Sequence, residues 1–468
     1  MPIGRFLKGV SATAILLLAF VAPSARAAQA DAHPVQTGEA PAKAGAPSPL
    51  MKDFMGLCGH YFFDGPTYAP AAGLVRNYHS LNWDLDVTKP YSDPPYPFAL
   101  NRVNWEDLYG GWRKAGFEID ACLMSEGIRP TAWVTPEETA YGYGKAFARF
   151  FGPSGRGLVG TVELGNEPGD YPDDRYVVIA RAMARGLKEG DPRIRIATAN
   201  LALGESTRYA KSVKCYEGWL DQIDILNVHS YALVGDWLKQ RRTYPEDPAS
   251  TYLSKVRDVL TWRDAHAPGK EVWVTEFGWD AHRAEGAPLE AGVPIDQRPS
   301  TLTRVQQAQF LARSYLIFAR MGVERACMFW YRDEGAEKGL FNACGLISKG
   351  VRQPAFYALA SLRKNLGDYA FGQALSEQAE GIYAYRFEDG GDRACVAVWS
   401  PTLNGEERAA EIELANAGLA DFAFARAVEL TTSESGDTNV DVELEGGRAK
   451  LRATGMPRLL FFVRKVAG

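Results

Sequence analysis

Two glutamates in this sequence follow short strand-like runs, where their carboxylates could work as a pair. Glu167 comes after the run Val162–Gly165, within Asn-Glu-Pro, and Glu276 ends the run that starts at Val272. Glycoside hydrolysis needs two such groups, because one must donate a proton to the leaving oxygen while the other, ionised, attacks the anomeric carbon. The pair therefore indicates acid–base and nucleophilic chemistry on a sugar.

Strands must position these glutamates, and residues 51 to 366 alternate short apolar runs with helical patterns. Most runs are rich in β-branched or aromatic residues and precede polar loops, which predicts strands. The eight runs are Met55–Tyr61, Leu74–His79, Glu118–Met124, Thr161–Gly165, Arg195–Asn200, Ile223–His229, Glu271–Glu276 and Ala326–Trp330. Eight such α/β units match a (β/α)8 TIM barrel with right-handed crossovers. An open doubly wound sheet is the structural rival.

Helical patterns between the runs complete most of the units. They are expected near Trp105–Ala115, Gly144–Phe151, Asp173–Glu189, Arg208–Leu220, Tyr252–His266, Leu302–Met321 and Ala355–Leu366. The first unit is irregular, because Pro66 and Pro70 disfavour a full helix between the first two strands. The match to G-x-G-x-x-G at Gly155–Gly160 precedes a predicted strand instead of following one, and no G-x-x-x-x-G-K-[ST] loop is present, so nucleotide binding is unsupported.

The fourth and seventh strands face each other across an eight-stranded barrel, and active residues lie at the carboxyl ends of its strands. Glu167 and Glu276 should therefore converge on one cleft. A structural ion pair with Arg76 or Arg332 is the alternative for these glutamates. Glu163, inside a strand, and Glu271, at the start of one, are poorer candidates.

After about Tyr369 the hydrophobic pattern changes to period two. Tyr383, Tyr385 and Phe387 alternate with other residues before the hairpin signal Asp-Gly-Gly-Asp, and Val440–Leu444 alternates similarly. This predicts a C-terminal antiparallel β-sandwich domain. The expected divisions are a signal peptide at 1–27, an Ala/Pro-rich flexible linker at 28–50, a catalytic barrel at 51–366 and the β-sandwich at 367–468. Alternatively, Met51–Tyr61 donates a strand to the sandwich.

The first 27 residues predict export to the periplasm or the extracellular space. A basic start precedes the apolar run Val10–Ala22 and a small-residue A-x-A cleavage site. This run is too short to span a bilayer, and no later stretch is long and apolar enough to be a membrane helix. The net charge of −5 becomes −8 without this segment, which excludes a general nucleic-acid binder. The oligomeric state stays open.

Cysteine and histidine spacing predicts no metal and no other cofactor. The chain has six cysteines and six histidines but neither a C-x-x-C pair nor an H-E-x-x-H motif. A Cys327–Cys344 disulfide is one candidate bridge. The absence of a G-x-S-x-G elbow leaves a serine hydrolase unsupported.

Three motifs together resemble clan A glycoside hydrolases, which are retaining (β/α)8 enzymes. They are Asn-Glu-Pro after the fourth strand, Thr-Glu-Phe-Gly at the seventh, and Phe329-Trp330-Tyr331 at the eighth. The resemblance covers roughly residues 51–366. The appended sandwich is similar to families 39 and 79, whereas His229-Ser230-Tyr231 is closer to the family 5 pattern, so the family is left open.

The resemblance implies a role for each matching residue. Glu167 would be the general acid/base and Glu276 the nucleophile. Asn166 would bind the sugar 2-hydroxyl, with a capping or turn residue as the alternative. Arg76 would hold Glu276 ionised, since an adjacent cation lowers a carboxylate pKa; a core or surface pairing is its alternative.

Four further residues would complete the sugar site by the same resemblance. Tyr231 would hydrogen-bond Glu276, His229 would line the floor, and Trp330 would stack on the sugar. His60 is a further candidate for sugar contact. Each also has a purely structural interpretation, as a packing or hydrogen-bonded core residue.

Tryptophans near strand ends suggest a carbohydrate cleft with several subsites. They are Trp83, Trp105, Trp133, Trp279 and Trp330, and the long loop Asp280–Ser300 could wall one end of the cleft. The sequence thus predicts an exported retaining β-glycosidase that cleaves a polysaccharide or oligosaccharide, with endo action favoured. A non-catalytic carbohydrate-binding protein on the same scaffold and a transglycosylase are the alternatives.

Overall fold

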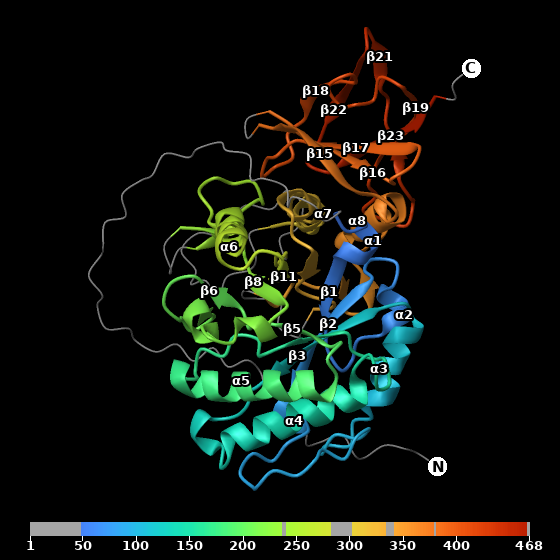
Figure 1. The fold of residues 1–468 in the computed structure, drawn as a ribbon. Helices are drawn as coiled ribbons and strands as arrows, with labels where there is room; N and C mark the ends of the chain where they lie inside the picture. Colours follow the sequence, from blue (N-terminus) through green and yellow to red (C-terminus); the bar gives the residue numbers. More distant parts are fainter. Residues whose placement is uncertain (1–47, 236–239, 282–301, 334–340, 379–380, 466–468) are drawn as a thin grey trace, which may run out of the picture. The chain divides into compact units, whose positions relative to one another are not determined.

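Eight parallel strands close into a barrel in the computed structural model of this chain, which describes residues 48–235, 240–281, 302–333, 341–378 and 381–465. The strands are β1 (Met55–Gly59), β2 (Leu74–Ser80), β3 (Glu118–Met124), β4 (Thr161–Glu163), β5 (Arg195–Ala197), β8 (Ile225–His229), β11 (Glu271–Phe277) and β12 (Arg325–Met328). Their order is β1-β12-β11-β8-β5-β4-β3-β2, closed between β1 and β2 (Figure 1). The predicted TIM barrel is confirmed, and the open doubly wound sheet is excluded.

All eight predicted strands are present, with ends that differ by a few residues. Every residue of β1 and β8 is buried, as expected for strands covered on both faces. Gly56 in β1 permits close packing against β12, because a Cβ there would lie 2.6 Å from Cys327 Sγ. The barrel interior is therefore filled by side chains rather than open.

Helices connect most of the strands and surround the barrel. They are α1 (Met51–Phe54), α2 (Gly65–Tyr68), α3 (Trp105–Lys114), α4 (Pro136–Phe151), α5 (Asp173–Gly190), α6 (Tyr252–His266), α7 (Arg304–Met321) and α8 (Pro354–Leu366). Capping fixes the ends of α7, where Thr303 and Gln306 form a capping box and Gly322 adopts a left-handed φ of 82°. The short 3₁₀ segments are η1 (Leu81–Trp83), η2 (Pro130–Ala132), η3 (Val213–Tyr216) and η4 (Leu220–Gln222).

The helix predicted over Arg208–Leu220 is wrong. Lys211–Ser212 instead forms β7, which pairs with β6 (Leu201–Ala202), and η3 and η4 follow. Gly218, with φ of 79°, interrupts the segment between these two turns. The backbone of this unit is thus used in a small ladder and two tight turns, which leaves no room for a continuous helix.

The C-terminal part of the chain forms the predicted antiparallel sandwich. Its strands are β15 (Ala370–Glu377), β16 (Tyr383–Glu388), β17 (Arg393–Trp399), β18 (Arg408–Glu413), β19 (Phe422–Glu429), β20 (Thr438–Asn439), β21 (Glu443–Glu445), β22 (Arg448–Ala453) and β23 (Arg458–Arg464). One sheet has the order β15-β16-β17-β23-β19-β20 and the other β18-β22-β21. Two antiparallel pairs of short strands form separate two-stranded sheets. They are β9 (Leu233–Val234) with β10 (Arg241–Arg242) and β13 (Ile347–Ser348) with β14 (Val351–Arg352).

Apart from Arg393, the central strand β17 of the larger sheet is buried on both faces. In β17, Val396 and Val398 belong to the core between the two sheets, whereas Cys395, Ala397 and Trp399 belong to the core that includes the barrel. Alternate residues of one strand thus serve two cores, as the period-two pattern requires.

A buried ion pair ties the sandwich to the barrel. Arg313 of α7 donates through Nε to Glu246 Oε1 at 2.9 Å, and Trp399 Nε1 of β17 donates to the same oxygen at 2.6 Å. Arg313 also donates to Thr402 O at 3.1 Å. These contacts join α7, the segment after β10 and the sandwich.

Two alternatives that the sequence leaves open are excluded. Met55–Gly59 lies in the barrel rather than the sandwich, although Leu50 forms an isolated antiparallel bridge with Ala370. The Cys327–Cys344 bridge is absent, since all six cysteines are buried free thiols and Cys327 packs inside the barrel with Cys58.

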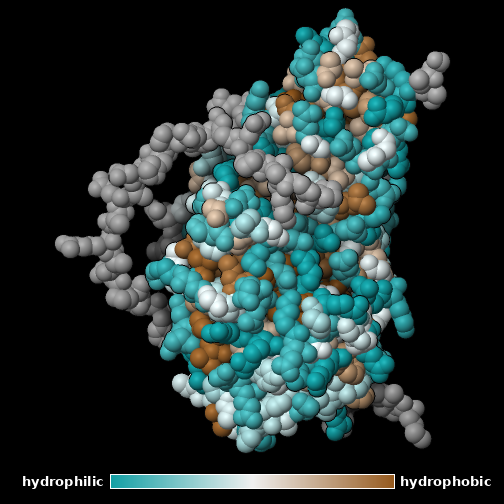
Figure 2. Space-filling view, in the orientation of Figure 1, coloured by the Kyte–Doolittle hydropathy of each residue, from teal (hydrophilic) through white to brown (hydrophobic). Residues whose placement is uncertain are grey.

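Some predictions fall outside the described residues. The signal peptide, most of the linker at 28–50 and most of the loop Asp280–Ser300 are among them. No helix within the described ranges is long and apolar enough to cross a membrane. On the face shown in Figure 2, hydrophilic residues predominate and hydrophobic ones are scattered.

Candidate active site

Glu276 is placed by an irregularity in β11. The register of β11 against β8 shifts so that Val274 pairs with Val228 and Glu276 pairs with His229, which leaves Thr275 as an extra residue. Bulges of this kind re-aim side chains and are frequent next to active sites. The shift puts Glu276 beside His229 at the carboxyl end of the barrel.

Glu167 is carried by the loop that follows β4. Gly165 has a φ of 104°, a conformation that glycine adopts readily, and it turns the chain into Asn166 and Glu167. Asn166 O then accepts a hydrogen bond from Asn200 N at 3.1 Å, which fixes the loop against the next unit. The side chain of Glu167 is 25% exposed and that of Glu276 is 8% exposed, so the two carboxylates have different access to solvent.

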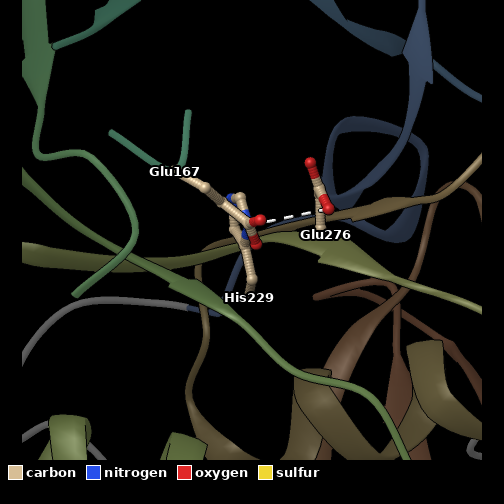
Figure 3. A group of neighbouring side chains, drawn as sticks. All are labelled: Glu167, His229 and Glu276. Carbon is tan, nitrogen blue, oxygen red and sulfur yellow. Dashed lines mark hydrogen bonds and ion pairs between the residues drawn. The ribbon is translucent and has the colours of Figure 1, made fainter. Parts of the chain in front are cut away.

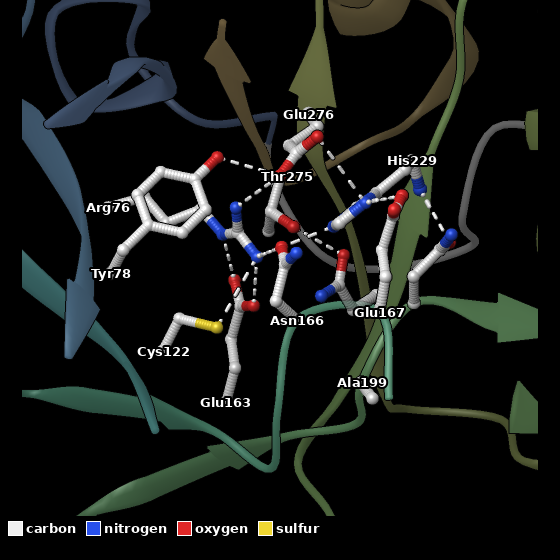
Figure 4. Close-up of polar contacts among 12 residues, drawn as sticks. Arg76, Tyr78, Cys122, Glu163, Asn166, Glu167, Ala199, His229, Thr275 and Glu276 are labelled. Atoms are coloured by element: carbon white, nitrogen blue, oxygen red, sulfur yellow. Dashed lines mark hydrogen bonds and ion pairs between the residues drawn. The ribbon is translucent and has the colours of Figure 1, made fainter. Parts of the chain in front are cut away.

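Arg76 of β2 is the centre of the polar network in Figure 4. Its Nε and Nη2 donate to the two oxygens of Glu163 at 2.7 and 2.6 Å, a bidentate pair with both side chains fully buried. Its Nη1 donates to Glu276 Oε1 at 2.8 Å, and Nη2 also donates to Asn166 Oδ1 at 2.9 Å. One guanidinium thus connects strands β2, β4 and β11.

Two tyrosines also donate to Glu276. Tyr231 Oη donates to Oε2 at 2.9 Å, and Tyr78 Oη donates to Oε1 at 2.7 Å. Tyr78 was not among the predicted site residues. Its position two residues after Arg76 on β2 is a signal that could have found it, because alternate residues of a strand share one face.

His229 lies between the two predicted catalytic carboxylates (Figure 3). Its Nδ1 is 3.0 Å from Glu167 Oε1 and 3.6 Å from Glu276 Oε2. The ring is itself buried, and the backbone of His229 is held by Asn200 Oδ1, which accepts from His229 N at 2.8 Å. The structure therefore brings Glu167, Glu276 and His229 together at one point.

The surroundings of Glu276 favour its ionised form. Burial raises the pKa of this carboxyl, but His229, Arg76 and the hydrogen bonds from Tyr78 and Tyr231 outweigh burial, so the pKa lies below its ordinary value. An ionised carboxylate surrounded by donors is suited to act as a nucleophile.

A second carboxyl pair lies beneath the site. Burial and the neighbouring Glu163 raise the pKa of Asp120 well above its ordinary value. Burial opposes ionisation of Glu163 as well, but Arg76 outweighs it and lowers the pKa of Glu163. Asp120 is thus the neutral partner, and Glu163 carries the charge that balances Arg76.

Glu167, His229 and Glu276 could also be considered as metal ligands. Each offers one ligand atom, and these atoms lie within 4.8 Å of one another. However, Arg76 already pairs with Glu276, and tyrosine hydroxyls donate to both of its oxygens. A dication beside the guanidinium would be repelled, so this donor set fits a catalytic carboxylate better than a metal centre.

The predicted sugar-contact residues fall into two groups. Trp330 is half-buried and makes an edge contact with Tyr78, with ring centroids 5.7 Å apart, so it lies beside the glutamates. His60 instead lies against Trp83 at 5.6 Å, and no contact joins it to either glutamate among the described residues. Burial, together with Arg332, lowers the pKa of His60 to about 4, so the ring is neutral at pH 7.

The tryptophan interpretation needs correction. Trp105, Trp133 and Trp279 are no more than 4% exposed and belong to the core, so they offer no stacking face. The buried indole N–H groups have hydrogen-bond partners within the core. Trp105 Nε1 donates to Asp84, and Trp279 Nε1 donates to Thr243 O. Trp83 and Trp330 are the two members of the predicted set that are partly exposed.

Comparisons with known proteins identify the fold. No family model matches the chain, and no curated protein matches it. Among solved structures, a family 39 glycoside hydrolase from the gut symbiont Bacteroides cellulosilyticus WH2 aligns with a TM-score of 0.64 at 16% identity, over 89% of this chain and 82% of that chain. A glucosidase from Croceicoccus marinus aligns with a TM-score of 0.58 at 16% identity, over 91% of this chain and 98% of that chain.

A third structure shares the same architecture. The family 51 α-L-arabinofuranosidase from Bifidobacterium longum aligns with a TM-score of 0.57 at 14% identity, over 89% of this chain and 97% of that chain. At these identities the likeness concerns the fold. The resemblance to clan A glycoside hydrolase barrels is thus confirmed at that level, and the roles of individual residues stay predictions.

Proposed function

We propose that this protein is a retaining glycoside hydrolase that cleaves β-glycosidic bonds of a polysaccharide or oligosaccharide. The observation that carries the proposal is the proximity of Glu167 and Glu276, whose oxygens lie within 4.8 Å of each other. Retaining enzymes hold their carboxyl groups about 5–5.5 Å apart, whereas inverting enzymes need about 6.5–9.5 Å to admit a water. The spacing supports retention.

In the first step Glu276 attacks the anomeric carbon. A bond forms between its carboxylate oxygen and that carbon, while the glycosidic bond breaks and its electron pair stays on the leaving oxygen. Glu167 gives its proton to that oxygen. Arg76, Tyr78 and Tyr231 fix the orientation of Glu276 through the contacts described above and keep it ionised before the attack.

In the second step water hydrolyses the glycosyl ester on Glu276. Glu167, now ionised, takes a proton from the water, whose oxygen bonds to the anomeric carbon while the ester bond breaks. Both glutamates return to their starting states. Asn166, held by Arg76, would bind the sugar 2-hydroxyl, and Trp330 would stack on the sugar ring.

We further propose that the enzyme acts within chains. Half-buried Trp83 and the exposed Tyr61 and Phe62 lie together, with Tyr61 and Trp83 centroids 6.1 Å apart. The side chain of Arg332 lies over Phe62 and over Tyr331, which contacts Trp330 beside the glutamates. These aromatic surfaces could bind sugar units beyond the cleavage point.

The test is digestion of a polysaccharide panel with wild type and Glu276→Gln. The panel should include β-1,4-glucan, β-1,4-xylan and arabinoxylan, because similar folds belong to a glucosidase, GH30 xylanases and an arabinofuranosidase. We expect wild type to release products from one substrate, with early products longer than one sugar, and the variant to be inactive. Equal inertness of both proteins, together with sugar binding, would favour the carbohydrate-binding alternative.

Stereochemistry separates the mechanisms. Proton NMR of the first product should show the β-anomer before mutarotation if the reaction proceeds with retention. An α-anomer as the first product would overturn the double-displacement proposal. Products longer than the starting oligosaccharide would indicate transglycosylation through the same intermediate.

A further inference from the structure

Glu126 contacts the backbone of both Asn166 and Glu167. Its Oε1 accepts hydrogen bonds from Asn166 N at 2.7 Å and from Glu167 N at 2.6 Å. Its Oε2 is shielded from solvent and has no hydrogen-bond partner among the described residues. One oxygen of this carboxylate therefore accepts hydrogen bonds from two consecutive amides of the loop that carries Glu167.

The segment that carries Glu126 is itself anchored. Glu126 follows β3 in a turn in which Ile128 N donates to Ser125 O at 2.8 Å. The hydroxyl of Tyr171 contacts both ends of this turn, at 3.1 Å from Ser125 O and 2.7 Å from Ile128 O. Trp133 Nε1 in turn donates to the Tyr171 hydroxyl at 3.0 Å. Glu126 is thus presented by a fixed turn rather than by a free loop.

We propose that Glu126 is a positioning residue for the general acid/base: it clamps the backbone of Asn166 and Glu167 so that the Glu167 carboxyl stays aimed at the leaving oxygen. This inference rests on the proposed function. The geometry is suited to the task, because hydrogen bonds from two adjacent amides restrict the loop more than a single bond would. A displacement of about 1 Å at such a site can lower the rate about 100-fold.

The surroundings of Glu126 affect its own ionisation. Burial raises the pKa of Glu126 to about 7, in spite of the hydrogen bonds from the backbone. The nearby Glu167 adds to this increase in the pKa of Glu126. Cys122, Tyr171 and Tyr176 are the other titratable groups near Glu126, and burial raises the pKa of each, so they are neutral.

Amide exchange tests the clamp without any reliance on activity. We expect the Asn166 and Glu167 amides to exchange about 10-fold or more faster in Glu126→Ala than in wild type, because the variant lacks the oxygen that accepts from both amides. Glu126→Gln keeps an oxygen that can accept both bonds, so its exchange should stay near that of wild type. The control is Glu205→Ala, which removes an exposed glutamate paired with Lys214.

Leaving-group dependence tests the link to Glu167. The probes are 2,4-dinitrophenyl and phenyl β-glucosides and β-xylosides; the dinitrophenyl group leaves without a proton, whereas phenol needs one. We expect Glu126→Ala to lower kcat/KM about 10- to 100-fold on the phenyl glycoside and less than about 3-fold on the dinitrophenyl glycoside. Glu126→Gln should recover most of the loss, because its side-chain oxygen can still accept from both amides.

Each outcome decides the proposal. Equal losses on both glycosides in Glu126→Ala would indicate a general structural defect and would overturn the positioning role, as would unchanged amide exchange. If wild type cleaves none of the probes or polysaccharides, the glycosidase proposal fails, and the exchange result still decides whether the clamp exists.

Discussion

Arg76 and Glu276 form a buried ion pair in which Arg76 Nη1 donates to Glu276 Oε1 at 2.8 Å. The same guanidinium is held from below by Glu163. The charge that keeps Glu276 ionised is therefore fixed in place by a second carboxylate, and the contacts of Glu276 depend on residues from three strands.

Replacement of Glu276 by Gln should remove the proposed nucleophile while it keeps the shape of the side chain. We expect kcat/KM to fall by at least about 1,000-fold, as is typical when a group essential to the chemical step is lost. The matched control is Glu271→Gln, at the other end of the same strand, which should change kcat/KM less than about 3-fold. Circular dichroism should show that both variants are folded.

Replacement of Tyr231 by Phe should move the acid limb of the pH profile. In wild type the pKa of Glu276 lies below its ordinary 4.5, so Glu276 loses its charge only at lower pH. Without the hydroxyl donor this pKa rises, the acid limb of kcat/KM moves to higher pH, and kcat/KM at its maximum falls about 10-fold. An unchanged acid limb in Tyr231→Phe would show that this hydroxyl does not stabilise the ionised form.

Most of the barrel could be predicted from the sequence because its strands are buried and apolar. The runs around Glu167 and Glu276 are continuous and short, and both glutamates follow them at the position where a barrel presents its catalytic groups. The helix predicted over Arg208–Leu220 is wrong because the spacing of its apolar residues suits a helix, whereas pairing of Lys211–Ser212 with β6 decides the structure of this segment. Local pattern carries no information about such a pairing.

The outer part of the site was harder to predict. Glu126 acts through hydrogen bonds to backbone amides forty residues away, and no spacing or residue type indicates such a contact. The prediction that Trp105 and Trp279 line a cleft is wrong, because a tryptophan near a strand end can face either the core or the cleft. Their burial depends on the helices that cover them, which is a tertiary property.

Replacement of Glu163 by Gln should destabilise the barrel. Arg76 would lose the buried carboxylate that balances it, and the removal of one partner of a buried ion pair typically lowers the free energy of unfolding by about 3–5 kcal/mol. Urea unfolding, followed by tryptophan fluorescence, would measure the change. A free energy of unfolding within about 1 kcal/mol of wild type would mean that Arg76 is balanced without Glu163.

Replacement of Asp120 by Asn should stabilise the protein, and more so at high pH. The pKa of Asp120 is raised on folding, so above about pH 4 the folded state holds a proton that the unfolded state has lost. Stability from this group therefore falls as the pH rises, and the neutral Asn avoids that loss. The difference in Tm between Asp120→Asn and wild type should grow from pH 4 to pH 8. A constant difference would contradict a neutral Asp120.

Replacement of Trp399 by Ala should weaken the barrel as well as the sandwich. The variant loses a fully buried indole that belongs to the shared core and donates to Glu246. We expect a loss of about 3–5 kcal/mol in the free energy of unfolding. Because β17 contributes side chains to both cores, calorimetry should show one shifted transition. Two separate transitions would indicate that the sandwich unfolds independently.

The extra residue in β11 has a consequence for protein engineering. Removal of Thr275 would restore an unbroken ladder with both neighbouring strands, because the register shifts by one residue against β8 and against β12. The same deletion would keep Glu276 paired with His229 but would remove the buried contacts of Thr275 with Asn227 and Cys58. Redesign guided by strand regularity alone would therefore regularise the sheet but remove two buried contacts next to the proposed nucleophile, so the length of this strand should be kept fixed whatever residues are substituted within it.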